Sequence, residues 1–137
     1  GGMGTMLQNS AAANYSIPEE VNFTHPYIVR EIHTKYLQAG ADIINDIWGA
    51  KYDKNIAKVA ALYNVPIILM HNRQPKPYEN LMKDVVADLQ ESIDIAIEAG
   101  VKKENIILDP GIGFAKTYEE NLIVMNNCEI EQGHNPI

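Results

Sequence analysis

Hydrophobic side chains recur at steps of three and four residues in several segments of the chain, which is the period of a helix that packs on one side. The predicted helices cover residues 25–38, 53–63, 78–99 and 117–127. Gly40 and Gly100 follow two of these segments and are typical helix stops. Asp53 is a suitable N-cap, and Thr117 with Glu120 three positions later forms a capping-box pattern.

Between these helices lie apolar runs that are too short for helices. They predict buried strands over residues 41–47, 65–70 and 105–108, with a possible fourth strand near the N-terminus. Strands that alternate with helices pair in parallel through right-handed crossovers. The pattern therefore predicts the α/β class with parallel β/α units.

An open doubly wound sheet and a closed barrel both satisfy this alternation. A closed eight-stranded β/α barrel takes roughly 250 residues, whereas this chain has 137. We expect a single β/α domain over residues 1–137 with a partial, half TIM-barrel-like sheet.

Composition and charge narrow the function. The chain is 46% hydrophobic, which suffices for a core, and its net charge of −7 with scattered basic residues argues against a nucleic-acid partner. Cys128 is the single cysteine and cannot form an internal disulfide. No apolar run has the length of a membrane span or a signal peptide. We expect a cytoplasmic protein with no membrane partner.

Polar side chains follow each predicted strand, and parallel strands bring such ends to one rim of the sheet. These strand-end residues are Asn45, Asp46, Met70, His71, Asn72 and Asp109. Asp109 either caps the "PGIG" turn or accepts paired N–H donors from the edge of a guanidine-like ring. Asn45 either closes its strand end or contacts the same ligand, and Asp46 orients neighbouring groups or meets solvent.

His71 is best explained as a structural histidine whose ring nitrogens are hydrogen-bonded inside the protein. Together with Cys128, His33 and His134 it shows no spacing typical of zinc ligands, so we expect no metal site.

The stretch "DPGIGFAKT", residues 109–117, places two glycines just ahead of a capped helix. A glycine-rich loop before a helix can bind an anion through its free N–H groups. The spacing matches neither the phosphate-binding loop nor the dinucleotide fingerprint, so the pattern alone leaves this interpretation open.

The strings "GADIINDIWG", "VPIILMHN", "AIEAGV" and "IILDPGIGFAKT" occur in this order between about residues 40 and 127. This region resembles the middle of a bacterial dihydropteroate synthase, a β/α-barrel enzyme of folate synthesis. The resemblance implies that Asn45 and Asp109 hydrogen-bond a pterin ring at the bottom of the barrel. It also implies that Met70 and Phe114 help to wall the pocket.

Residues 1–44 instead resemble the start of a homocysteine S-methyltransferase, on "GGMGTMLQ" and "PEEVNFTHPYIVREIHTKYLQAGADII". That family continues with a Glu-Thr-Asn-Thr-like segment, whereas this chain continues with "NDIWG". The chain thus resembles a chimera whose junction falls inside "AGADII". The tail, residues 128–137, matches neither family. Cys128 does not replace the adjacent cysteines expected to hold the zinc of the methyltransferase, which disfavours that activity.

The synthase resemblance further implies a loop for magnesium and diphosphate and two last strands with basic residues, which this sequence does not show. We therefore expect pterin binding rather than turnover, and assign no catalytic residue. If the chain is active, the reaction is the transferase condensation of a pterin-methyl diphosphate with p-aminobenzoate. Mg²⁺ is then expected only with a bound diphosphate. The alternative is a non-catalytic recombined or designed β/α fragment that folds and self-associates. A homodimer is one form that this self-association can take.

Overall fold

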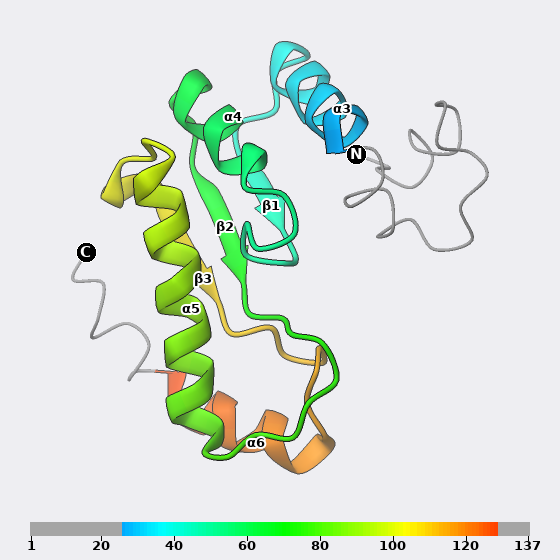
Figure 1. Ribbon diagram of the computed structural model, residues 1–137, viewed down its shortest axis with the longest axis vertical. Coiled ribbons are helices and arrows are strands. Elements are labelled where there is room, and N and C mark those ends of the chain that lie inside the picture. The colour runs from blue at the N-terminus through cyan, green and yellow to red at the C-terminus, as the bar shows by residue number, and fades with distance from the viewer. Residues whose placement is uncertain (1–25, 129–137) are drawn as a thin grey trace.

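The computed structural model of the chain describes residues 26–128 (Figure 1). Its elements are α3 (Pro26–Gln38), β1 (Ile44–Asp46), α4 (Asn55–Tyr63), β2 (Ile67–Met70), α5 (Leu81–Glu98), the short 3-10 helix η2 (Lys103–Asn105), β3 (Ile106–Asp109) and α6 (Tyr118–Asn126). The alternation of strands and helices predicted from the apolar pattern is confirmed within these residues. The possible N-terminal strand and residues 129–137 of the tail lie outside them.

The three strands form one parallel sheet in the order β1-β2-β3. In its register, Asn45 of β1 lies beside Ile68 of β2, Ile68 lies beside Ile107 of β3, and Met70 lies beside Asp109. Neighbouring strands in space are thus neighbours in sequence, which is the order found in a β/α barrel. The predicted class, parallel β/α units with a partial barrel-like sheet, is confirmed.

One face of the sheet packs against helices. Ile44, Ile67, Leu69 and Ile106 point to this face and join apolar residues of α4 and α5 in the main core. The opposite face carries Asn45 and Ile107, which are exposed. Side chains alternate between the two faces of a strand. Asn45 and Ile107 are therefore accessible to a ligand or to further protein on this face of the described residues.

Several element ends differ from the sequence prediction. The strand predicted over 41–47 is paired only at Ile44–Asp46, and Ile43 before it is 40% exposed. The helix predicted from residue 78 begins at Leu81, because the side chain of Asn80 accepts the N–H of Lys83 at 3.1 Å and caps the helix there.

The two predicted helix-start signals both make hydrogen bonds. Oδ1 of Asp53 accepts the N–H of Asn55, the first residue of α4, at 2.9 Å, but the N-cap of this helix is Lys54, so the prediction of Asp53 as the N-cap is wrong by one residue. The Thr117 hydroxyl accepts the N–H of Glu120 at 3.3 Å, and the Glu120 carboxylate accepts the N–H of Thr117 at 2.7 Å. The reciprocal capping box at the start of α6 is therefore confirmed.

Candidate functional site

The carboxyl ends of the three strands meet at one rim of the sheet, because the strands are parallel and adjacent. Asn45 and Asp109 lie on the outer two strands, β1 and β3, and the register places both on the face opposite the helices. Two strand spacings and a two-residue offset put their Cα atoms about 12 Å apart. The predicted ligand residues therefore share one face at a separation that a bicyclic ring can bridge.

Asn45 is exposed, and within the described residues its side chain makes no hydrogen bond. Asp109 uses only one of its carboxylate oxygens: Oδ1 accepts the N–H of Gly111 at 2.8 Å. Oδ2 has no protein donor within residues 26–128. Asp109 thus caps its own turn, as one interpretation of the sequence held, and still offers an acceptor to a ligand.

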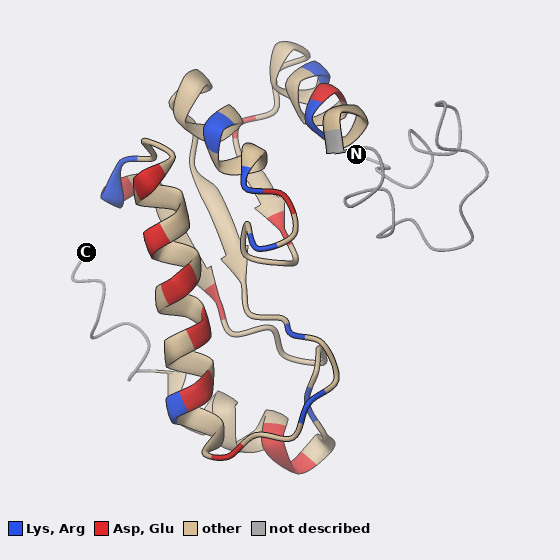
Figure 2. Cartoon of the chain, in the orientation of Figure 1, with Lys and Arg blue, Asp and Glu red and all other residues tan. Residues whose placement is uncertain are grey.

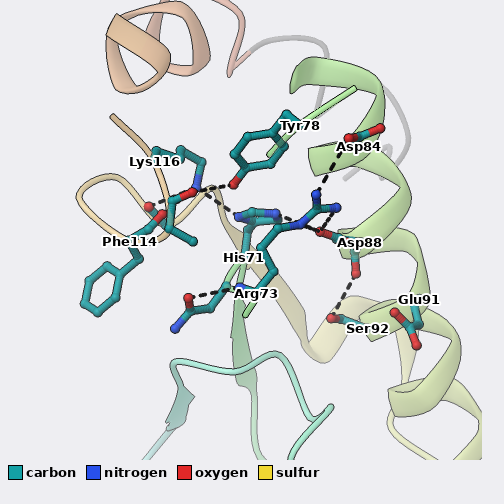
Figure 3. A network of polar contacts seen from close by, with 12 residues as sticks. His71, Arg73, Tyr78, Asp84, Asp88, Glu91, Ser92, Phe114 and Lys116 are labelled. Carbon is teal, nitrogen blue, oxygen red and sulfur yellow. Dashed lines mark hydrogen bonds and ion pairs between the residues drawn. The ribbon is translucent and has the colours of Figure 1, made fainter. Parts of the chain in front are cut away.

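Met70 lies beside Asp109 in the sheet register and is only 4% exposed. The turn at Gly111 covers it, since a Cβ built on Gly111 would lie 3.4 Å from Cγ of Met70. Phe114, in contrast, is 42% exposed on the loop before α6. The structure thus brings Met70 next to Asp109, whereas the Phe114 ring points away from the neighbouring polar groups (Figure 3).

The loop of residues 109–117 is a tightly bonded turn. The N–H of Gly111 donates to the Asp109 carboxylate, the N–H of Gly113 to Oδ1 of Asn121, the N–H of Phe114 to the Gly111 carbonyl, and the N–H of Thr117 to the Glu120 carboxylate. These donors are not available to an anion. The interpretation of this loop as an anion-binding site is therefore wrong for these N–H groups.

Asp46 points to the helix side of the sheet, unlike Asn45. Its carboxylate accepts the N–H of Trp48 at 3.1 Å and that of Ala50 at 2.6 Å, so it shapes the turn after β1. Burial raises the pKa of this carboxyl, and the two N–H donors oppose the rise. The expectation that Asp46 orients its neighbours is confirmed.

His71 is completely buried and lies between a lysine and an aspartate. Its Nδ1 is 2.9 Å from Nζ of Lys116, and its Nε2 is 3.0 Å from Oδ2 of Asp88 (Figure 3). An ammonium can only donate, so Nδ1 accepts and the proton sits on Nε2. Burial, together with the charge of Lys116, lowers the pKa of His71 to about 4, against the opposing effect of Asp88. His71 is thus a neutral structural histidine, as expected.

The same network engages further basic side chains near the rim. Arg73 donates to Oδ2 of Asp88 through Nε at 2.8 Å and through a terminal nitrogen at 2.7 Å, and its guanidinium lies 4.6 Å from the centre of the Tyr78 ring. Lys51 lies 3.9 Å from the carboxylates of Asp88 and Glu91. Acidic residues occur along the length of α5 (Figure 2). Sequence reasoning missed this cluster, because its members come from distant segments.

Among residues 26–128, no group of three His, Cys, Asp or Glu side chains is arranged to hold a metal ion. In the same part of the chain, no helix is long and apolar enough to cross a membrane.

Two protein-family models match the sequence. The model described as pterin binding enzyme matches residues 29–132, and the model described as homocysteine S-methyltransferase matches residues 1–47. They overlap over residues 29–47, which include the string "AGADII". Both resemblances seen in the sequence, and the chimera-like arrangement of the two, are thus supported.

Among curated proteins, the dihydropteroate synthase of Clostridium beijerinckii is 67% identical over 93 residues, which are 68% of this chain and 35% of that protein. The dihydropteroate synthase of Bacillus subtilis is 63% identical over 97 residues, which are 71% of this chain and 34% of that protein. The chain therefore spans about a third of the length of these relatives.

Solved structures of dihydropteroate synthases are similar in fold to this chain. A dihydropteroate synthase from Clostridium difficile, crystallised in the presence of pteroic acid, superposes with a TM-score of 0.73 at 27% identity, covering 90% of this chain and 55% of that one. The Thermus thermophilus enzyme in complex with 6HMPPP gives 0.69 at 28% identity, covering 76% and 43%. Since the pterin-binding model also matches more than half of the sequence, the chain belongs to the family of pterin binding enzymes.

Proposed function

We propose that this chain binds a pterin on the helix-free face of its sheet, between Asn45 and Asp109. The observation that carries the proposal is that the register places both side chains on one face while the Asn45 amide and Oδ2 of Asp109 make no protein hydrogen bond within residues 26–128. A carboxylate suits the ring N–H and exocyclic amine of a pterin: Oδ2 accepts one of the two parallel hydrogen bonds, and Oδ1 accepts the other at the acceptor site that its bond to Gly111 leaves open. Asn45 then meets the neighbouring ring nitrogens.

Met70 and Phe114 complete the proposed pocket. Met70 is adjacent to Asp109 and lies under the Gly111 turn, so it would support the floor of the pocket from below as an adaptable apolar side chain. Phe114 is 42% exposed on the same loop as Asp109, so its ring is accessible to a ligand bound there.

The relatives suggest a reaction, the condensation of a pterin-methyl diphosphate with p-aminobenzoate. Here we infer pterin binding without turnover. Arg73, Lys51 and Lys116 at the rim are engaged in ion pairs or hydrogen bonds, and four N–H groups of the loop are bonded internally. The described residues offer no group of metal ligands, so Mg²⁺ would enter only with a diphosphate.

Isothermal calorimetry with 6-hydroxymethylpterin tests the proposal. We expect saturable binding by the unaltered chain and at least tenfold weaker binding by Asp109→Asn, since one charge-assisted hydrogen-bond pair is lost. The amide oxygen introduced by this substitution can still accept the N–H of Gly111, so the turn is retained. Asp94→Asn on the exposed side of α5 is the matched control. Absence of heat above buffer, or equal affinity in Asp109→Asn, contradicts the proposal.

A second candidate is self-association through the same face. Ile107 is 45% exposed and Ile43 is 40% exposed beside Asn45, and a parallel sheet is ordinarily covered on both faces. A second copy of the chain would supply that cover as a homodimer. This candidate can be distinguished from pterin binding, because a second copy bound on this face would compete with the pterin.

A further inference from the structure

The ammonium of Lys116 donates hydrogen bonds to several carbonyls of the loop that follows Asp109 and contains Phe114. Its Nζ lies 2.8 Å from the Pro110 carbonyl, 3.1 Å from the Gly111 carbonyl and 3.2 Å from the Phe114 carbonyl. The fourth neighbour is Nδ1 of His71 at 2.9 Å. One nitrogen thus donates to carbonyls at the start and at the end of the turn. The Asp109 carboxylate accepts the N–H of Gly111 in the same turn.

His71 connects this ammonium to the rest of the fold. The backbone N–H of His71 donates to the Asp109 carbonyl at 2.7 Å, which extends the pairing of β2 and β3 by one step. The His71 ring donates through Nε2 to Oδ2 of Asp88 on α5, and Arg73 donates to the same carboxylate oxygen. The loop is therefore attached to the helix layer through a continuous series of hydrogen bonds (Figure 3).

From this geometry we infer that Lys116 is a positioning residue for the pterin pocket: it holds the 110–117 turn so that Asp109 and Phe114 face the ligand. The inference rests on the proposed function. Lys116 need not touch the pterin, since its nitrogen is directed to loop carbonyls and to His71. The three N–H donors of a compact ammonium can serve these four converging acceptors if two of the carbonyls share one donor, whereas a planar guanidinium presents its donors in a fork.

Two variants test the inference, Lys116→Met and Lys116→Arg, with Lys83→Met on the exposed side of α5 as the control. Hydrogen exchange of residues 110–117 is measured together with calorimetry of 6-hydroxymethylpterin. In Lys116→Met we expect exchange in this loop to rise at least tenfold and pterin affinity to fall about tenfold. Lys83→Met is expected to change neither.

Lys116→Arg keeps the positive charge, so it serves if the methionine variant does not fold. It is expected to loosen the loop and to weaken pterin binding as well. Asp109→Asn separates the two effects, since it weakens binding while exchange in the loop stays as in the unaltered chain. A purely structural lysine would lower thermal stability without this selective change in affinity.

The outcomes distinguish the inference from the function beneath it. Unchanged loop exchange, or a loosened loop with unchanged pterin affinity, overturns the positioning role alone. Unaltered affinity in Lys116→Arg overturns the requirement for a single compact nitrogen. Absence of pterin binding by the unaltered chain overturns the proposed function, and the positioning role falls with it, whatever the exchange data show for the loop.

Discussion

Gly111 packs against the backbone carbonyl of His71 so closely that no Cβ fits between them, and its φ of +67° lies in the left-handed region. The turn after β3 therefore requires glycine for two independent reasons. This close approach lets the loop lie over Met70 and keeps Asp109 at the rim.

Gly111→Ala is expected to lower the free energy of unfolding by roughly 2–4 kcal/mol, from backbone strain plus the displacement of the His71 carbonyl. Gly113→Ala is the matched control, since Gly113 also has a positive φ, +87°, but a Cβ there meets nothing within 4 Å. It is expected to cost only about 1 kcal/mol. Urea unfolding of both variants measures the difference. Equal losses would show that the approach to His71 does not matter.

The depressed pKa of His71 predicts a dependence of stability on pH. The unfolded chain binds a proton at the ordinary value of 6.5, whereas the folded chain binds it at about 4, because the site is buried and faces Lys116. The unfolded state therefore takes up the proton first as pH falls. Stability is complete above about pH 6.5 and is lost between there and pH 4, by up to about 3 kcal/mol.

Urea unfolding at several pH values between 4 and 7 checks this expectation. His71→Asn removes the titrating ring, so the difference in slope between the two proteins isolates its effect from that of Asp88 and the other carboxylates. Proton NMR of the His71 ring offers a direct measurement. A ring that titrates near 6.5 in the folded protein would contradict a buried, neutral histidine.

The capping box of α6 predicts a smaller effect. Thr117→Ala removes the acceptor for the N–H of Glu120 and is expected to cost about 1 kcal/mol of stability. Thr117→Ser retains a hydroxyl and is expected to stay close to the unaltered protein. Chemical denaturation compares the three proteins. A loss in the serine variant as large as that in the alanine variant would point to the methyl group instead.

Self-association through the open sheet face predicts a dimer in size-exclusion chromatography with light scattering. Ile107→Glu places a charge on β3 of this face, where Ile107 is 45% exposed, and is expected to shift the population to monomer. Leu62→Glu is a control, since Leu62 is 79% exposed at the end of α4. A monomer at all concentrations in the unaltered chain rules out this candidate.

Much of the fold follows from local sequence. The period of apolar residues located every helix and strand of the described part apart from the short η2, because an amphipathic segment must bury its apolar side. The capping box at Thr117 is equally local, since the residues involved are three positions apart. That Asn45 and Asp109 lie on one rim could be predicted because strands joined by helices are parallel and carry their ends to the same edge.

Other features depended on contacts between distant residues. Lys116 and His71 are 45 positions apart, and no local pattern around either residue predicts their hydrogen bond. The anion-binding interpretation of the glycine loop was wrong for the N–H groups that are already bonded: that of Gly111 finds Asp109 locally, whereas those of Gly113 and Thr117 find Asn121 and Glu120 once α6 is in place. Local sequence thus determined the elements and their polar ends. The strand register and the packing of the loop against His71 and α6 decided which polar atoms are already bonded within the protein and which remain for a ligand.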